Sequence, residues 1–142
     1  MIYLDTSAIV KLLVQEEHSK EVHKAVELKP VRTVSIAFVE VLSALSRKSD
    51  LDDDERVAAV REFQASWHRF NPVPTDSILE VAGVLTRSYQ LRAFDAIHLA
   101  AAKELGPPST ILFAVYDLDL ARAAHREGFK LLTDPKFKLA FS

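Results

Sequence analysis

Four acidic side chains occupy positions where a charge is not obviously in contact with solvent. Asp5 and Asp117 each directly follow a short apolar segment, "IYL" and "ILFAVY" respectively. Glu40 is the only charge in "IAFVEVLSALS", and Asp95 lies in the largely apolar stretch "LRAFDAIHLAAA". Burying an ionised carboxylate is costly unless a partner compensates its charge, so each of these acids needs a partner.

A divalent cation is a partner that all four acids could share. Two carboxylates about 4 Å apart repel each other by roughly 4 kcal/mol at an effective dielectric constant of about 20. The chain has no cysteine, and a site built from oxygen ligands alone favours a hard ion, Mg²⁺ or Mn²⁺. A carboxylate cluster with hydrated Mg²⁺ is typical of nucleases, in which metal activates a water for attack on phosphorus and stabilises the leaving oxygen.

Each acid, taken singly, also has a structural explanation. Asp5 and Asp117 are good N-cap residues for a following helix, and Asp95 suits the first turn of a helix, where the helix dipole favours an acid. Glu40 caps nothing, because it lies inside a predicted helix between apolar neighbours. The alternative for Glu40 is a buried salt bridge, with Lys11, Arg47 or Arg92 as its partner.

The elements that must position these acids alternate between strand and helix. Apolar and β-branched runs predict strands at residues 2–4, 31–35, 111–116 and 129–133, with a short extended piece at 70–75. Helical periodicity and capping residues predict helices at residues 8–17, 19–28, 36–47, 53–69, 77–89, 91–102 and 117–128. In the fifth of these, Asp76 or Ser77 is the expected cap, with Ser77 and Glu80 spaced as a capping box.

This alternation predicts an α/β domain with a parallel central sheet and right-handed crossovers. Ligands of open parallel sheets bind outside the carboxyl ends of the strands, where Asp5 and Asp117 should share one rim. We find no internal repeat and no second domain, so residues 1–142 are expected to form one domain. Residues 51–69 lie between two strands without a strand of their own, which predicts a protruding helical hairpin.

Composition excludes several classes of protein. The 142 residues carry 18 basic and 20 acidic side chains, a net charge of −2, which argues against a broad basic surface for nucleic acid. It still allows contact with phosphates through metal and a few basic residues. No apolar run reaches the roughly 20 residues of a membrane span, and the first residues lack a signal peptide pattern, so we expect a cytoplasmic protein.

The order and spacing of four motifs resemble those of a known family. "MIYLDTSAIVKLL", the Glu in "SIAFVEVLSAL", "AFDAIHLAAA" and "AVYDLDLARAAHREGF" are similar to the PIN-domain family, and within it to the VapC-type ribonuclease toxins of toxin–antitoxin pairs. The resemblance implies that Asp5, Glu40, Asp95 and Asp117 ligate Mg²⁺ or Mn²⁺ and support RNA cleavage.

The same resemblance implies a fold and a set of partners. The fold is a three-layer α/β/α domain with a central parallel sheet. The implied partners are an RNA substrate, with tRNA and rRNA as candidates, a second copy in a homodimer, and an antitoxin whose tail lies over the site. No membrane is implied.

Residues beside the four acids are candidates for supporting roles. Thr6 or Ser7 matches the family hydroxyl that follows the first acid, and Asp119 is a second candidate acid close to Asp117. We prefer Asp117 as the ligand, because it directly follows the predicted strand. Many family members carry Thr or Ser two residues before the last acid, where this chain has Val115, so one hydroxyl near the metal is missing.

Three further side chains near the predicted site have either a functional or a purely structural explanation. His98 follows Asp95 by three residues and can share a helix face with it, but we expect a packed or hydrogen-bonded histidine and not a ligand. Arg87 and Arg92 flank the site and are candidate contacts for RNA phosphates. Solvated charges at helix ends are the alternative for both.

Other functions compete with this interpretation. "AVYDLDLA" resembles the DxD of aspartyl-phosphate phosphatases, but that motif should follow the first strand, where Ser7 replaces the second acid. A receiver domain needs an Asp at a central strand end near mid-chain, where "KSDLDDDERV" is loop and helix. Within the family, the alternatives are an RNA-processing nuclease without an antitoxin and an inactive domain that binds RNA or a partner. Retention of all four acids argues against inactivity.

Apolar side chains of the 51–69 segment suggest a surface for the partner. We expect helix faces of the N-terminal half and of this hairpin to contact a second copy or an antitoxin. An ordinary place in the core is the alternative for these residues, which are Val57, Val60, Phe63 and Trp67.

Overall fold

Four short parallel strands form the centre of the protein in a computed structural model that describes residues 1–141. They are β1 (Ile2–Leu4), β2 (Val31–Arg32), β3 (Leu112–Ala114) and β4 (Lys130–Leu132), in the order β2-β1-β3-β4. All three neighbouring pairs are parallel. The predicted α/β class with a central parallel sheet is therefore confirmed.

The central strand β1 is buried along its whole length, which its apolar sequence requires. Leu4 pairs with Ala114 of β3, and the Asp5 N–H continues the ladder by donating to the Ala114 carbonyl at 3.2 Å. The ends of β1 and β3 therefore lie at the same level. This register is what brings the residues that follow the two strands to one rim of the sheet.

The strand β1 has the predicted bounds, whereas β2, β3 and β4 are shorter than the sequence predicted, although sheet-like contacts continue beyond β2 and β3. Beyond β2, Val34 forms an isolated parallel bridge with Val73, so the predicted extended piece at 70–75 continues the sheet edge. The Thr33 hydroxyl donates to the Leu4 carbonyl at 2.8 Å. Beyond β3, the Val115 N–H donates to the carbonyl of Leu132 at 3.0 Å.

Seven helices surround the sheet, and none of those described within residues 1–141 is both long and apolar enough to cross a membrane. They are α1 (Thr6–Leu13), α2 (Ser19–Val26), α3 (Ala37–Arg47), α4 (Asp53–Ser66), α5 (Leu79–Tyr89), α6 (Ala93–Glu104) and α7 (Leu118–Arg126). Short 3-10 turns occupy Trp67–Phe70, Thr75–Ile78, Pro108–Thr110 and Pro135–Ala140.

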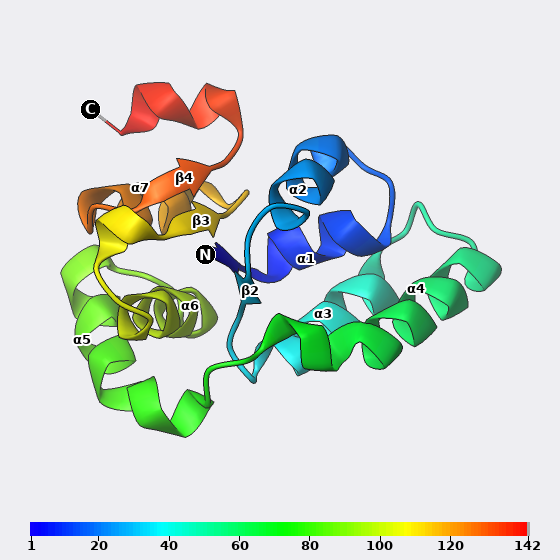
Figure 1. Ribbon diagram of the computed structural model, residues 1–142, viewed down its shortest axis with the longest axis horizontal. Coiled ribbons are helices and arrows are strands. Elements are labelled where there is room, and N and C mark those ends of the chain that lie inside the picture. The colour runs from blue at the N-terminus through cyan, green and yellow to red at the C-terminus, as the bar shows by residue number, and fades with distance from the viewer. Residues whose placement is uncertain (142) are drawn as a thin grey trace.

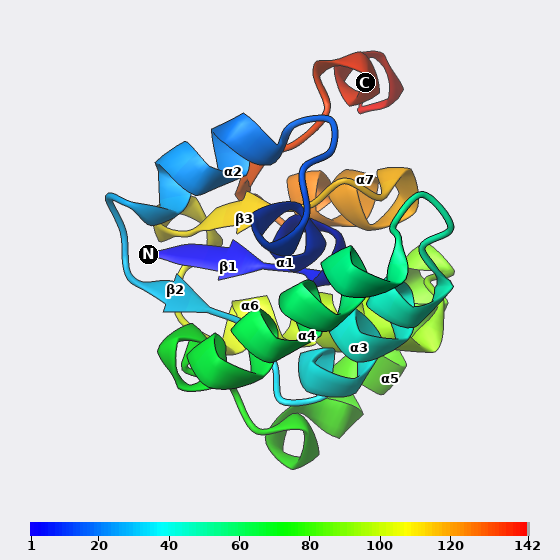
Figure 2. The same cartoon turned by 90° about the vertical axis from the view of Figure 1, so that its right-hand side faces the viewer.

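The helices form layers on the two sides of the strands. Helices α5 and α6 pack together on one side, and α2 lies on the other (Figures 1 and 2). Helix α6 contacts both α5 and α7, and its residues 96–102 are all buried. A helix enclosed in this way must be apolar all round, which explains the composition of the "LRAFDAIHLAAA" stretch.

The protruding helical hairpin is present, but its arms differ from the predicted ones. Helices α3 and α4 extend together away from the sheet, at the right of Figure 1. Residues 51–69 supply only one arm, α4 and the 3-10 turn after it. Helix α4 begins with a capping box, in which Asp52 accepts from the Glu55 N–H at 2.8 Å and Glu55 accepts from the Asp52 N–H at 3.1 Å.

Most of the apolar side chains proposed as a docking surface on this hairpin are part of the core. Phe63 is fully buried, and Val60 and Trp67 are partly buried against the core. Phe63 and Trp67 pack with Phe38 in one aromatic cluster. Only Val57 of the four is exposed. The core alternative is therefore correct for three of these residues.

The start of α5 also differs from the prediction. Residues Thr75–Ile78 form a 3-10 turn, and the helix begins at Leu79 without a side-chain cap. The hydroxyl of Ser77 donates to the Pro74 carbonyl at 2.9 Å. The predicted capping box with Glu80 is therefore wrong, because the proline before the turn supplies a nearer acceptor.

Candidate metal centre

Asp5 lies at the carboxyl end of β1 and is buried. Its Oδ1 accepts from the Ala8 N–H at 2.9 Å, which makes it the N-cap of α1, and from the Ser7 hydroxyl at 2.6 Å. The capping explanation for Asp5 is therefore correct. Capping does not use the whole carboxylate, because both hydrogen bonds go to Oδ1 and leave Oδ2 for another ligand.

Asp117 has the matching place after β3. Its Oδ2 accepts from the Leu120 N–H at 3.0 Å and caps α7. Its Oδ1 lies 3.4 Å from the guanidinium of Arg92. Both predicted strand-end acids thus cap a helix through one oxygen and keep the other for a different contact.

Asp95 lies in the first turn of α6, as its helix-dipole explanation expects. Its Oδ2 is buried and has no hydrogen-bond partner. The nearest cation, Nε of Arg92, is 3.6 Å away, and the Arg92 side chain is 78% exposed. A buried carboxylate oxygen without a hydrogen bond is an unsatisfied acceptor, so this position favours a further positively charged ligand.

One surface cavity brings three of the four predicted acids together. Asp5, Asp95 and Asp117 line this acid cavity, whose volume is about 390 Å³. The remaining lining residues are Thr6, Ser7, Val10, Glu16, Ala44, Arg47 and Lys48. Among residues 1–141, no three of the predicted acids bring ligand oxygens within 4.8 Å of one another. The acids therefore surround open space, which suits a cation that keeps several of its waters.

Glu40 is not part of this lining. It lines an adjoining hollow that shares Thr6, Ala44 and Arg47 with the acid cavity. Its Oε1 lies 2.8 Å from Nε2 of His98. The alternative explanation of Glu40, a salt bridge to Lys11, Arg47 or Arg92, is not what the structure shows, because the buried His98 is its partner.

His98 is the centre of a buried hydrogen-bond network and is 2% exposed. Besides Glu40, its Nε2 contacts the Thr6 hydroxyl at 3.1 Å, and its Nδ1 contacts the Tyr3 hydroxyl at 2.8 Å. An ionised Glu40 only accepts, so Nε2 carries a hydrogen and, in the neutral ring, Nδ1 accepts from Tyr3. The structure places His98 as a packed residue that fixes Glu40 beside the acid cavity.

Two acids of the cavity, Asp95 and Asp5, have a raised pKa in the absence of a cation. Burial raises the pKa of Asp95 to about 6, with the nearby Asp117 carboxylate adding to the rise and Arg92 opposing it. Burial also raises the pKa of Asp5, against the lowering effect of His98 and of its own hydrogen bonds. Oxygen donors, mutual repulsion and the unsatisfied Asp95 oxygen together fit Mg²⁺ or Mn²⁺.

The predicted supporting residues divide into those near the acids and those away from them. Ser7 donates to Asp5 and accepts from the Tyr116 N–H at 3.0 Å, so its hydroxyl links the ends of β1 and β3. Asp119 is 70% exposed, lies 3.6 Å from Arg122 and does not line the acid cavity. Arg87 is exposed and also lies outside the cavity lining.

Sequence reasoning did not identify a basic side of the acid cavity. Arg47 and Lys48, at the end of α3, both line it. Lys48 pairs with Glu16 at 2.6 Å, and Lys11 pairs with the same carboxylate at 3.0 Å. The available signal was the basic end of "SALSRK", but only the packing of α3 against α1 shows that it meets the acids.

Comparisons with known proteins agree with this fold. The sequence model of the PIN domain matches residues 2–133. The relatives include Ribonuclease VapC45 of Mycobacterium tuberculosis, 34% identical over 136 residues that cover 92% of this chain and 94% of the relative. Ribonuclease VapC3 of Pyrobaculum aerophilum is 30% identical over 112 residues, covering 74% of this chain and 83% of the relative.

Solved structures with the same fold have more distant sequences. FitAcB from Neisseria gonorrhoeae has a TM-score of 0.67 at 20% identity, covering 93% of this chain and 96% of the other. VapBC2 from Rickettsia felis, bound to a DNA fragment from their promoter, has a TM-score of 0.62 at 12% identity, covering 94% and 99%. At this level of identity the likeness concerns the fold.

Proposed function

The chain belongs to the PIN-domain family, and we propose that it is a metal-dependent endoribonuclease and the toxin of a type II toxin–antitoxin pair. The observation that carries this proposal is the acid cavity, which three of the predicted acids line and in which the buried Oδ2 of Asp95 has no hydrogen-bond partner. The proposal treats residues 1–142 as one nuclease domain. The alternative is an inactive binding domain, which would not require several poorly compensated carboxylates around one cavity.

Asp5, Asp95 and Asp117 would hold Mg²⁺ or Mn²⁺, with Glu40 as the fourth acid at the edge of the cavity. When bound, such an ion supplies positive charge that activates water for attack on phosphorus and stabilises the leaving oxygen. The protein's own contribution is rigidity. Helix capping fixes Asp5 and Asp117, and the enclosed helix α6 fixes Asp95.

Basic side chains around the acid cavity are suited to hold the RNA backbone. Arg92 is exposed and forms only long ion pairs with Asp95 and Asp117, so its guanidinium is free to exchange these partners for a phosphate. Arg47 and Lys48 line the cavity itself. We expect them, with Arg92, to position a phosphodiester over the acids, whereas the exposed Arg87 is not among the residues that line the cavity.

A cleavage assay on total RNA tests the proposed activity. Purified protein should cut RNA with Mg²⁺ or Mn²⁺ and stop with EDTA, and Asp5→Asn should lower the rate at least about 100-fold because it removes a ligand charge. Asp119→Asn is the matched control, since Asp119 lies outside the cavity lining and should leave the rate unchanged. Cleavage in EDTA, or full activity of Asp5→Asn, would contradict the assignment.

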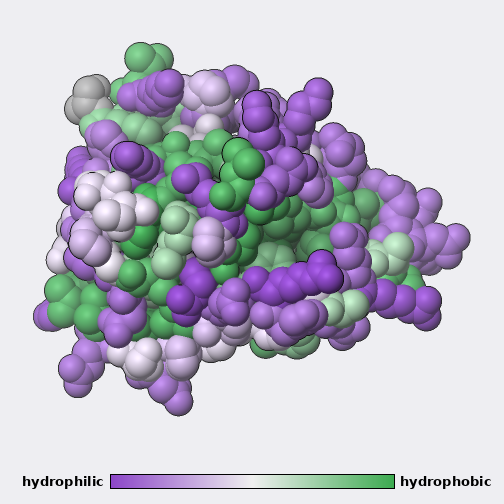
Figure 3. Space-filling model, viewed as in Figure 1, coloured by the Kyte–Doolittle hydropathy of each residue, from purple (hydrophilic) through white to green (hydrophobic). Residues whose placement is uncertain are grey.

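The proposed antitoxin requires a surface, and a groove beside α1 provides one. Figure 3 shows a hollow with an apolar floor and a polar rim between the α2 side and the α4 side of the molecule. Its volume is about 420 Å³, and its lining residues are Leu12, Leu13, His23, Val26, Val31, Glu62, Ser66, Arg69 and Phe70. An apolar floor with a charged rim fits the apolar face of an amphipathic peptide segment.

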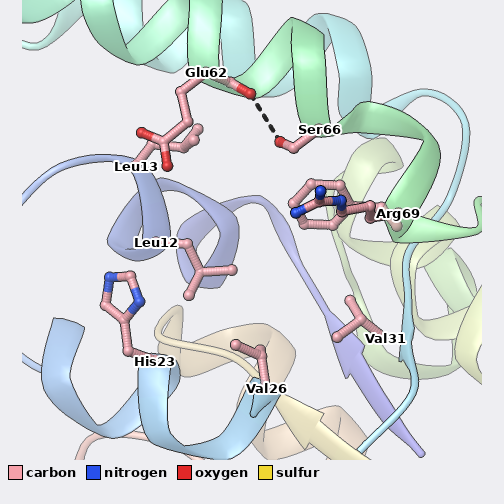
Figure 4. Close-up of a pocket in the computed structure, with 9 residues that line it drawn as sticks. Leu12, Leu13, His23, Val26, Val31, Glu62, Ser66 and Arg69 are labelled. Atoms are coloured by element: carbon pink, nitrogen blue, oxygen red, sulfur yellow. Dashed lines mark hydrogen bonds between the residues drawn. The ribbon is translucent and has the colours of Figure 1, made fainter.

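The groove side chains come from elements far apart in the sequence. In Figure 4, Leu12 of α1 lies above and Val26 of α2 lies below the same space, and Arg69 approaches it from the segment after α4. Glu62 and Ser66 of α4 form the remaining rim, where the Ser66 hydroxyl donates to the Glu62 carbonyl at 2.8 Å. We propose that an antitoxin segment binds here, which retains the predicted use of the N-terminal helices and of α4.

Two points remain open to test: the alternative function and the contact surface of the proposed homodimer. An RNA-processing nuclease without an antitoxin is the alternative function, and a small antitoxin gene beside the gene for this chain would distinguish the two. We propose that two copies of the chain contact each other through the exposed side chains of Val39 and Phe94. Both line the hollow that also contains Glu40.

A further inference from the structure

A second cluster of possible metal ligands lies away from the acid cavity. The turn before α2 meets the segment that follows β4, close to the C-terminal 3-10 turn (Figure 2). There, Nε2 of His18 lies 3.4 Å from Oε1 of Glu17 and 3.6 Å from Oδ2 of Asp134. Within residues 1–141, this is the set of three side chains whose ligand atoms all lie within 4.8 Å of one another.

The His18 ring is held in a fixed orientation. Its backbone is left-handed, with φ of 69°, and its ring stacks on Tyr116 with centroids 5.3 Å apart and an angle of 20° between the planes. Nε2 is buried and has no hydrogen-bond partner. A buried imidazole nitrogen between two carboxylates, without a hydrogen bond to either, is a polar atom that needs a ligand.

The two carboxylates are available to the same ligand. Asp134 uses Oδ1 to cap the C-terminal 3-10 turn, accepting from the Lys136 N–H at 2.9 Å, which leaves Oδ2 facing His18. Glu17 is exposed and so can move toward a shared centre at little cost.

The separations match the edges of a coordination polyhedron better than hydrogen bonds. A hydrogen bond between nitrogen and oxygen spans about 2.7–3.2 Å. In tetrahedral zinc sites the bonds to nitrogen and oxygen are about 2.0–2.2 Å, which places neighbouring ligand atoms about 3.4 Å apart. The observed 3.4 and 3.6 Å agree with that spacing.

We propose that Glu17, His18 and Asp134 form a site for Zn²⁺ or a similar transition-metal ion, with water completing the coordination. An imidazole nitrogen selects Zn²⁺, Co²⁺ or Ni²⁺ over Mg²⁺, so this site differs in chemistry from the acid cavity. The ion would link the start of α2 to the segment after β4. His18 and Asp134 are 116 residues apart in the sequence. This inference does not depend on the proposed nuclease function.

Cobalt substitution tests the site, because tetrahedral Co²⁺ with nitrogen and oxygen ligands absorbs visible light much more strongly than Co²⁺ in water. Full-length protein should develop this absorption with one equivalent of Co²⁺ and lose it when Zn²⁺ is added. His18→Asn should abolish it, and asparagine is a suitable replacement because it tolerates the left-handed backbone. Asp134→Asn keeps an oxygen for the cap and should weaken Co²⁺ binding at least about tenfold.

Two control variants separate this site from other ligands. Asp95→Asn changes the acid cavity and should leave the Co²⁺ spectrum intact, as should His23→Asn, which removes an exposed histidine on α2. In the Asp95→Asn background, which weakens the acid cavity, Zn²⁺ at about 100 times its Kd should raise the Tm by at least about 5 °C, and the added His18→Asn substitution should remove this rise. Absence of the Co²⁺ spectrum from the wild type, or an unchanged spectrum in His18→Asn, would overturn the site and leave His18 as an ion-pair partner of the two acids.

Discussion

Asp95 illustrates at the scale of one residue how the protein keeps a charge where its surroundings oppose it. Burial and the Asp117 carboxylate raise its pKa to about 6, and its Oδ2 has no hydrogen bond. The fold around it is tight, since the following residues of α6 are all buried. An ionised Asp95 therefore raises the free energy of the folded state until a cation binds.

The pH dependence of stability follows from that shift. Between about pH 4 and 6, folded Asp95 retains a proton that the unfolded chain releases, so the stability of the metal-free protein falls as pH rises through this window. Asp95→Asn removes the effect and, at about pH 8 in EDTA, should be more stable than the wild type by at most about 3 kcal/mol. Urea denaturation of both proteins at about pH 4, 6 and 8 measures the difference.

The comparison has a control in the exposed acid Asp119. Asp119→Asn should show no such pH-dependent difference from the wild type, because that side chain is 70% exposed. A variant Asp95→Asn that is less stable than the wild type at about pH 8 would show that the carboxylate is satisfied, contrary to the account.

The individual acids were predictable from the sequence, but their partners were not. Asp5, Asp95 and Asp117 stand out because each is a charge next to apolar segments, and the structure brings them to one cavity. The His98 contact of Glu40 spans 58 residues, and nothing local in the sequence indicates it. Arg47 was one of three alternative partners for Glu40, and its place on the acid cavity depends on how α3 packs.

At the scale of elements, helices were predicted more reliably than strand lengths and caps. Helical periodicity extends over many residues, so all seven helices were expected. The strands have only two or three residues each, and apolar neighbours do not show in the sequence where regular pairing ends: Val115, just beyond β3, still donates its N–H to the carbonyl of Leu132 in β4. The cap of α5 failed because Ser77 bonds to the carbonyl of Pro74, an acceptor that competes locally with helix capping.

The α3–α4 hairpin depends on its aromatic cluster. Phe63 is fully buried and packs against Phe38 and Trp67, with centroid distances of 5.6 and 5.4 Å. Phe63→Ala should therefore lower the free energy of unfolding by about 3–5 kcal/mol, measured by urea denaturation. Val57→Ala, on the same helix but exposed, should change it by less than about 0.5 kcal/mol. Similar effects of the two substitutions would mean that the cluster does not anchor the hairpin.

At the scale of the whole molecule, the apolar groove and the acid cavity are separate surfaces with no lining residue in common. Binding of a partner and cleavage of RNA should therefore be separable. Val26→Arg places a charge in the groove and should weaken binding of the protein encoded by the neighbouring antitoxin gene at least about tenfold, measured by calorimetry. RNA cleavage by the free variant should be unchanged.

A substitution on a different helix controls for a nonspecific effect of charge. Val81→Arg changes an exposed apolar residue of α5 and should leave antitoxin affinity intact. Equal affinity of Val26→Arg and the wild type would exclude the groove as the antitoxin site.

The central claim is that the acid cavity holds a divalent cation, and Mn²⁺ binding tests it without knowledge of the RNA. Calorimetric titration should be performed in a His18→Asn background, which removes the other candidate site. We expect saturable Mn²⁺ binding that Asp95→Asn weakens at least about tenfold and that Asp119→Asn leaves unchanged. Absence of Mn²⁺ binding, or the same affinity with Asp95→Asn, would contradict the account.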